Sequence, residues 1–282
     1  MVSLPSSLGS ISKMRKVVLF FLLFAHPFPG DAAAQTGAAA EVRGSMTAKG
    51  GFRNEDEIRD KFNNWRTDAD ARAWLETMGF AAGSILGVSA EKPHGDKADV
   101  IVNVRTNKGE SKQGISIKLV SSPTGFNQVD KRWLRQYAAM WGMPANVVKA
   151  LRLFSGEERP VGRSRRPDRM FLNEFDKDTQ AQVVGFFEAN RSAIIADLIE
   201  GDGENKAEWF MVAMKGQNKT QWILRPVRDA IGFFGGGNVE ITRSGNLRIG
   251  RITMQRKGGD GGRETAKMLQ FKLNPALLFE AK

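Results

Sequence analysis

Three polar residues near the middle of the chain could share one chemical task. Asp99 precedes the alternating stretch 100–104, and Ser116 and Lys118 stand two residues apart within the aliphatic stretch 115–120. Side chains two residues apart in a strand project from the same face, so a hairpin would bring all three to one edge. A carboxylate, a hydroxyl oxygen and an ammonium group in this arrangement would suit metal-dependent hydrolysis of a phosphodiester.

Each of these residues would have its own part in such a hydrolysis. Asp99 would hold Mg²⁺, a hard ion that prefers oxygen ligands and keeps several waters. The metal would activate its bound water, and Lys118 would orient that water and offset the charge of the transition state. A structural alternative is that Asp99 is a turn residue and that Lys118 protects an edge strand from aggregation.

Composition narrows both the chemistry and the partner. The 282 residues include no cysteine and only two histidines, His26 and His94. Thiol nucleophiles, cysteine-ligated zinc and Ser-His-Asp triads are therefore hard to build. The formal net charge is +11, and most of the excess lies beyond residue 40. A strongly basic body favours a polyanion as the partner.

The elements that would position these residues can be read from hydrophobic spacing. Val100, Val102 and Val104 alternate as in a strand, and the polar residues 106–114 would form a loose loop back to the strand at 115–120. Two helices would precede this hairpin, the first capped by Asn54. The first helix would bury Ile58, Phe62 and Trp65, with Glu55 on the same inward side. The second would cover 71–80.

Further elements are expected along the rest of the chain. Val129, Trp133, Tyr137 and Met140 have helical spacing, and 180–199 reads as one longer amphipathic helix. Strands are expected at 208–214, 221–225, 247–257 and 268–273. The glycine run at 232–238 lacks both a Walker lysine and a GxGxxG pattern, so it is interpreted as a turn. Because we see no linker, residues 40–282 are expected to form a single domain.

The chain resembles a known family in four blocks: "TAKGGFRNEDEI", "GDKADVIVNV", "IKLVSSPTGFNQVDKRW" and "TMQRKGGDGGRETAKMLQFKLNP". From about residue 40 to its end it is similar to the HinP-type type II restriction endonucleases of the PD-(D/E)XK nuclease superfamily. The resemblance implies an α/β restriction-endonuclease-like core, with a mixed central sheet flanked by helices. It also implies Mg²⁺-dependent cleavage of double-stranded DNA at GCGC, after the first G and with a 5′ overhang.

The resemblance also assigns roles to individual residues. It makes Asp99 the metal-binding aspartate, Lys118 the catalytic lysine and Glu55 the glutamate that a helix brings to the site. Ser116 departs from the pattern, because the superfamily has Asp or Glu there, so the carbonyl of Ile117 or a water would serve as a ligand. For Glu55 the alternative is an acidic residue in a first helical turn, which the helix dipole favours.

Two segments have the composition of DNA contacts. In 125–131, Phe126 and Gln128 could enter the base stack as a wedge, unless Phe126 belongs to the core. The glycine-rich stretch 255–265 could read bases in a groove or contact phosphates only. The arginines of 159–169 are interpreted as phosphate contacts or as a solvated loop. The expected DNA-binding residues are Phe126, Asn127, Gln128, Lys131, Gln255, Arg256, Lys257, Asp260 and Arg263.

Alternatives remain for the activity and for the N-terminus. Because Ser116 is neutral, a catalytically impaired, sequence-specific DNA-binding protein is the second hypothesis. Residues 1–39 resemble a secretory signal, with Arg15 and Lys16 before the apolar run 17–25, and would fit a secreted nuclease of broad specificity. That run is too short to span a membrane. Because the resemblance begins only near Glu41, we favour a start codon assigned too far upstream. A cytoplasmic protein is expected, because a restriction enzyme must meet incoming DNA where its methyltransferase works. A separate cognate DNA methyltransferase is expected, and the nuclease would be a monomer or a homodimer.

Overall fold

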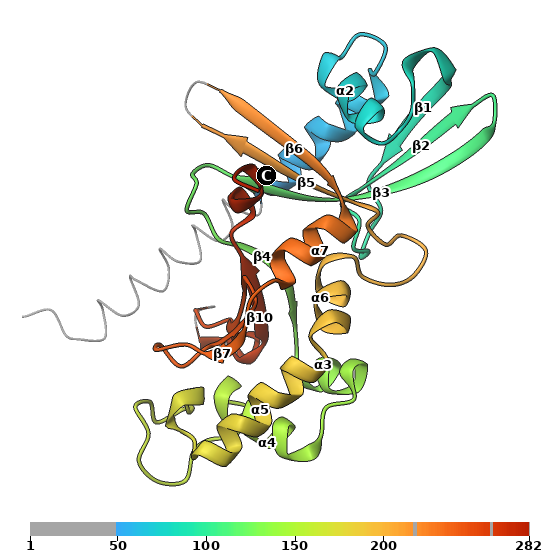
Figure 1. Cartoon of the computed structure of the whole chain (residues 1–282). Coiled ribbons are helices and arrows are strands. Elements are labelled where there is room, and N and C mark those ends of the chain that lie inside the picture. Colours follow the sequence, from blue (N-terminus) through green and yellow to red (C-terminus); the bar gives the residue numbers. More distant parts are fainter. Residues whose placement is uncertain (1–48, 217–218, 260–261, 282) are drawn as a thin grey trace, which may run out of the picture.

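The computed structural model describes residues 49–216, 219–259 and 262–281. The expected extension at residues 1–39 lies outside this part of the chain. Two five-stranded sheets and their flanking helices form a mixed α/β architecture (Figure 1). The first sheet has the order β1-β2-β3-β5-β6, and only the pairing of β3 with β5 is parallel. Its strands are β1 (Ile85–Glu91), β2 (Val100–Thr106), β3 (Gly109–Val120), β5 (Trp209–Lys215) and β6 (Thr220–Pro226).

The second sheet is antiparallel throughout and has the order β4-β10-β9-β8-β7. Because β4 directly follows β3 in the chain, the segment between them leads from one sheet to the other (Figure 1). This places the end of β3 in the first sheet next to the start of β4 in the second. Its strands are β4 (Asn127–Arg132), β7 (Val239–Ile241), β8 (Leu247–Ile249), β9 (Ile252–Arg256) and β10 (Leu269–Leu273).

Helices flank both sheets. Residues 49–63 are helical and pack with α2 (Ala69–Thr77) on the first sheet. The remaining α-helices are α3 (Leu134–Trp141), α4 (Ala145–Ser155), α5 (Lys177–Ala189), α6 (Arg191–Ile199) and α7 (Val227–Gly235). In Figure 1, α3, α4 and α5 gather at the end of the molecule farthest from α2, while α6 and α7 lie between. Short 3-10 turns occur at Ala82–Ser84, Leu172–Glu174, Glu264–Lys267 and Pro275–Phe279.

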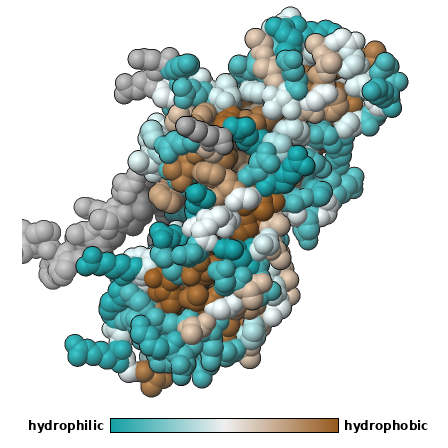
Figure 2. All heavy atoms as spheres, in the orientation of Figure 1, coloured by the Kyte–Doolittle hydropathy of each residue, from teal (hydrophilic) through white to brown (hydrophobic). Residues whose placement is uncertain are grey.

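The two faces of β3 serve different cores. Ile115 and Ile117 pack in a cluster with Ile58 and Phe62 of helix 49–63. The opposite face of the sheet carries Phe210 of β5, which belongs to a larger cluster that also contains residues of β9 and β10. This larger cluster joins the two sheets. Hydrophilic side chains dominate the visible surface, with an apolar area in its lower half (Figure 2).

The predicted hairpin is confirmed, but its loop is much shorter than expected. Strand β2 pairs antiparallel with β3, and Val100, Val102 and Val104 are buried on one face. The turn closes between Thr106 and Gly109, because the polar residues that follow already pair in the ladder. This outer arm is largely solvent-exposed, so backbone hydrogen bonding sustains it without an apolar pattern.

Several other predicted elements are wrong in their boundaries. Asn54 is not a cap, because residues 49–53 are already helical and Asn54 lies buried inside the helix. The helix expected to begin near Val129 begins only at Leu134, since 127–132 pairs with β10 as a strand. Tertiary strand pairing here overrides local helical spacing.

Two predicted segments are interrupted where a residue leaves regular geometry, and a predicted turn is instead the end of a helix. The helix expected over 180–199 is divided at Asn190 into α5 and α6. The strand expected over 247–257 is two strands, β8 and β9, joined at Gly250 with φ +57°. The glycine run interpreted as a turn continues α7 to Gly235, and the chain leaves the helix only at Gly236.

Candidate functional site

The β2–β3 hairpin brings Asp99, Ser116 and Lys118 into direct contact. The Lys118 ammonium donates to Ser116 Oγ at 3.2 Å, to the carbonyl of Ile117 at 2.9 Å and to Asp99 Oδ2 at 3.4 Å. Ser116 Oγ lies 3.5 Å from the same carboxylate oxygen. One residue just before β2 and two residues of β3 therefore surround one small polar volume.

Local backbone geometry explains why Asp99 points there. Its amide N–H donates to the carbonyl of Ile115 at 2.8 Å, which continues the ladder beyond the start of β2. Its Oδ2 then accepts the N–H of Ile117 at 2.6 Å, so the side chain takes the place of a backbone acceptor. The carboxylate therefore satisfies an N–H inside β3 that lies beyond the start of β2, and this bond fixes its direction.

Burial, rather than strand order, bears on the two readings of Lys118. Strand β3 lies between β2 and β5, but its pairing with β2 ends at Ile115, so at Lys118 only β5 is paired. A charge that protects an edge strand is exposed to solvent, which the Lys118 side chain is not. Ser116 is 1% exposed, and the side chains of Lys118 and Asp99 are 13% and 26% exposed. The cluster therefore reaches solvent mainly through the Asp99 carboxylate.

Helix 49–63 brings Glu55 close to this cluster. The carboxylate of Glu55 is 16% exposed and lies 3.0 Å from the ammonium of Lys92. Burial raises the pKa of Glu55 and the charge of Asp99 acts in the same direction, against the hydrogen bond from Lys92 and the charge of Lys118. Because residues 49–54 are already helical, Glu55 lies beyond the first turn and the alternative of a first-turn acid is wrong.

Lys92 is a residue that sequence reasoning missed. It directly follows β1, and its ammonium also contacts Asp56 Oδ1 and the carbonyl of Phe52, both at 3.2 Å. No pattern marks it, since a lysine after a strand is usually solvated. Its importance comes from the packing of β1 against helix 49–63.

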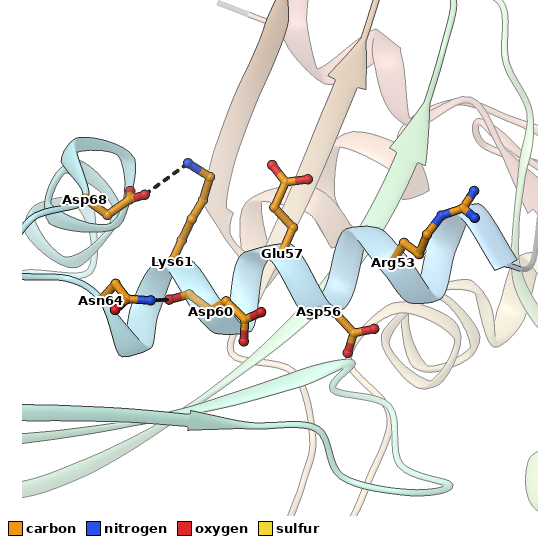
Figure 3. A pocket seen from close by; sticks show the side chains of 7 residues that line it. All are labelled: Arg53, Asp56, Glu57, Asp60, Lys61, Asn64 and Asp68. Carbon is orange, nitrogen blue, oxygen red and sulfur yellow. Dashed lines mark hydrogen bonds and ion pairs between the residues drawn. The ribbon is translucent and has the colours of Figure 1, made fainter.

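A groove of about 530 Å³ follows another side of the same helix (Figure 3). Its charges are matched locally, as Lys61 lies 3.1 Å from Asp68 and 2.8 Å from Asp70. Glu55 does not line it, so this groove is separate from the hairpin cluster. The lining residues are Arg53, Asp56, Glu57, Asp60, Lys61, Asn64 and Asp68.

The donor chemistry of the cluster fits a hard divalent cation. Asp99 offers a carboxylate, Ser116 a hydroxyl and Ile117 a carbonyl, and all three are oxygen donors. Among the described residues, no group of three or more His, Cys, Asp or Glu side chains is arranged to hold a metal. A cation here would therefore depend on one carboxylate, neutral oxygens and water, the coordination that Mg²⁺ accepts.

The segment after β3 exposes the aromatic side chain that was expected to act as a wedge. Phe126 is 62% exposed, so the alternative that it belongs to the core is wrong. Asn127 donates to the carbonyl of Leu119 at 3.1 Å, which ties this segment to the end of the strand that carries Lys118. Gln128 accepts a hydrogen bond of 2.7 Å from Gln270.

Gln270 is a second residue that the sequence analysis did not select. It stands in β10 between Lys131 of β4 and Gln255 of β9, directly opposite both in the register. It is 8% exposed, on the face opposite the core residues Leu269 and Phe271. Because it stands between two apolar residues of an alternating strand, the sequence alone could have shown that it lies on the face opposite the core.

The glycine-rich stretch places its predicted contacts differently. Arg256 pairs with Asp168 at 2.7 Å and donates to the carbonyl of Ala266 at 3.2 Å, so its guanidinium anchors the arginine-rich segment. Asp260 lies outside the described residues. Gln255 lies in β9, and Lys257 and Arg263 stand before and after the glycines of the stretch. Gln255 is therefore separated from β4 only by β10, whereas Arg256 is bound to Asp168 and to the carbonyl of Ala266.

The arginines of 159–169 divide into two groups. The guanidinium groups of Arg165 and Arg169 lie 4.1 and 4.0 Å from the ring centre of Phe171. These two residues stabilise the segment by cation–π contact. Arg159, Arg163 and Arg166 are exposed and can contact a polyanion.

The arrangement of strands and helices is that of a restriction endonuclease of the PD-(D/E)XK type. The solved structure of restriction endonuclease MspI in complex with its cognate DNA matches with a TM-score of 0.54 and 12% sequence identity. The match covers 78% of this chain and 87% of that chain. At this identity the likeness establishes the fold.

The R.HinP1I restriction endonuclease family matches residues 78–279, and the chain belongs to this family. Family and fold together make it a type II site-specific DNA nuclease that binds double-stranded DNA. Asp99, Ser116 and Lys118 lie inside the matched residues, whereas Glu55 precedes them. Among curated proteins none matches the chain significantly. Within the described residues, no helix is long and apolar enough to cross a membrane.

Proposed function

We propose that this chain is a Mg²⁺-dependent endonuclease that cleaves double-stranded DNA at GCGC, after the first G, and leaves a 5′ overhang. The observation that carries the catalytic part is the contact of Lys118 with both Asp99 and Ser116. The GCGC site rests on the resemblance to HinP-type enzymes and on the family match.

In this proposal the hairpin residues hold the cation and position the attacking water. Asp99, Ser116 and the carbonyl of Ile117 would hold Mg²⁺, which supplies polarisation of the scissile phosphate and a more acidic bound water. Lys118 would donate a hydrogen bond to the attacking water and balance charge on the phosphate oxygens. Glu55 would add the second carboxylate that β3 lacks.

The DNA contacts proposed for the second sheet follow from its exposed side chains. Phe126 and Gln128 would enter the base stack next to the scissile phosphate, and opening that step costs a few kcal/mol, which added contacts offset. Gln255 and Lys131 would face the groove from β9 and β4, the strands on either side of β10. Asn127, Lys257, Arg263, Arg256 and Asp260 are the remaining proposed contacts, with Arg256 first released from Asp168.

The organisation of the protein completes the proposal. Residues 40–282 would act as one nuclease domain in the cytoplasm, and a separate methyltransferase would protect the host DNA. The enzyme would work as a monomer or as a homodimer. The hydrophobic cluster shared by both sheets supports the single domain.

Cleavage of plasmid DNA in Mg²⁺ tests the function directly. We expect cutting at GCGC by the wild-type protein and a loss of about 10²–10³-fold or more in rate for Lys118→Ala, as for other groups that stabilise transition-state charge. Lys149→Ala, at an exposed position of α4, is the matched control and should cut normally. Undiminished cleavage by Lys118→Ala, or tight binding of GCGC duplexes without cutting by the wild type, would contradict the proposal.

A further inference from the structure

Lys97 is a buried lysine that lies two residues before Asp99. Its ammonium donates to the carbonyl of Val129 at 3.1 Å and lies 3.4 Å from Asp130 Oδ2, both in β4. The side chains of Lys97 and Asp130 are only 13% and 8% exposed. Its stem lies against Gly201, where an added Cβ would stand 2.6 Å from Lys97 Cβ. The side chain is therefore held between β4 and the segment after α6.

Asp130 connects this lysine to a closed network. Its Oδ1 accepts the Tyr137 hydroxyl at 2.7 Å, and its Oδ2 lies 3.1 Å from the Arg132 guanidinium. Arg132 in turn lies 3.7 Å from Asp197. Two cations and two carboxylates balance one another, so removing Lys97 leaves Asp130 with two partners.

The network is placed between the two parts of the proposed machinery. Asp130 stands in β4 between Gln128 and Lys131, but faces the core side where Tyr137 lies. At the other end, the N–H of Ala98 donates to the carbonyl of Asn205 at 3.1 Å and the N–H of Asp99 bonds the carbonyl of Ile115. The backbone N–H groups of Ala98 and Asp99 are thus bonded to two other segments, and the side chain of Lys97 ties the residue before them to β4.

A buried ion pair is poor evidence for a stabilising role. Replacing such a pair with apolar residues is often neutral or stabilising, because taking two charges out of water costs several kcal/mol per ion. An ion pair does fix the direction and register in which two segments pack, whereas an apolar contact does not. That property matters where two sheets must keep one relative position.

We propose that the Lys97–Asp130 ion pair couples DNA contact by β4 to the placement of the Asp99 carboxylate. The inference rests on the proposed nuclease function. Lys97 is a positioning residue, since it touches neither the hairpin cluster's oxygen donors nor the proposed DNA contacts. Binding of the correct DNA sequence would fix the position of β4. The ion pair would then hold Lys97, and with it Asp99, in the matching position.

The test separates binding from cleavage in Lys97→Met. Equilibrium binding to a GCGC duplex is measured in Ca²⁺, and single-turnover cleavage in Mg²⁺ is measured on that duplex and on one with a single altered base pair. We expect binding within about threefold of wild type, a cleavage rate at least tenfold lower on GCGC, and a smaller loss on the altered duplex. The ratio of the cleavage rate on the GCGC duplex to that on the altered duplex should therefore be smaller than for the wild type. Lys97→Arg should recover part of the rate.

Three outcomes of this comparison would contradict the coupling. Equal losses on the two duplexes, a loss of binding that accounts for the slower cleavage, or an unchanged rate would overturn the coupling. If Lys97→Met does not fold, Asp130→Asn gives the same comparison, because it keeps the Tyr137 hydrogen bond and removes the charge facing Lys97. A wild-type protein that cuts no DNA would refute the proposed function itself, which distinguishes that failure from failure of the coupling.

Discussion

Ser116→Glu tests the reasoning about the hairpin cluster most directly, because it adds the carboxylate that the superfamily pattern has at this position. A charge where Ser116 Oγ now lies would be 3.2 Å from the Lys118 ammonium and 3.5 Å from Asp99 Oδ2. At an effective dielectric constant near 20, these separations correspond to about 5 kcal/mol of attraction and about 5 kcal/mol of repulsion. The two interactions nearly cancel.

What remains is the cost of burying a charge at a position that is 1% exposed. That cost is on the order of several kcal/mol, and for a domain of this size each kcal/mol lowers Tm by about 2–4 °C. Without divalent ions, Ser116→Glu should therefore unfold well below the wild type. Mg²⁺ bound by the folded state only should return about 2.7 kcal/mol at a concentration of 100 times Kd.

Thermal unfolding in EDTA and in excess Mg²⁺ measures both effects. We expect a larger Mg²⁺-dependent rise in Tm for Ser116→Glu than for the wild type. Ser111→Glu, on the outer arm of the same strand, is the matched control and should show neither the loss nor the larger rise. Equal Tm values in EDTA would refute the burial argument, and equal Mg²⁺ shifts would refute a cation site at Ser116.

Two further predictions concern the reading surface and the arginine-rich segment. Gln270→Ala should weaken binding to GCGC duplexes several-fold, because a hydrogen bond worth about 1 kcal/mol holds Gln128; Gln182→Ala removes a similar amide pair between helices and should bind normally in the same titration. Hydrogen bonds from the N–H groups of Phe171 and Arg165 lower the pKa of Glu174 despite its burial. Its contribution to stability is complete above the unfolded pKa and is lost as the pH falls through the lowered folded value. Unfolding measured across this acid range should show a flatter pH dependence for Glu174→Gln, and parallel curves would contradict it.

The parts of the fold that could be predicted are those in which local pattern and tertiary role agree. The hairpin of β2 and β3 follows from alternation, since Val100, Val102 and Val104 all face one core. Strand β4 could not be found this way. Its residues have helical spacing with α3, and only pairing with β10, some 140 residues later, makes them a strand.

The candidate site divides along the same line. Asp99 directly precedes β2, and Ser116 and Lys118 lie on β3, so the predicted hairpin brings the three residues together. Lys92 and Lys97 act through partners from other elements, and nothing in their own neighbourhood marks them. Arg256 shows the reverse error, because a residue type suited to base contact is engaged by Asp168 from a distant loop.

The serine in β3 becomes understandable once the charges around it are considered together. A carboxylate at Ser116 would be the second next to Asp99, with only Lys118 to offset both. The chain instead brings its second carboxylate, Glu55, on a helix that is anchored by the buried side chains of Ile58 and Phe62 and supplied with its own cation, Lys92. Each carboxylate then has a lysine beside it, Lys118 for Asp99 and Lys92 for Glu55, although burial still raises the pKa of Glu55. The placement of Glu55 thereby depends on helix packing rather than on the register of β3. Substitution of the apolar residues that anchor that helix should therefore displace Glu55 relative to the hairpin cluster.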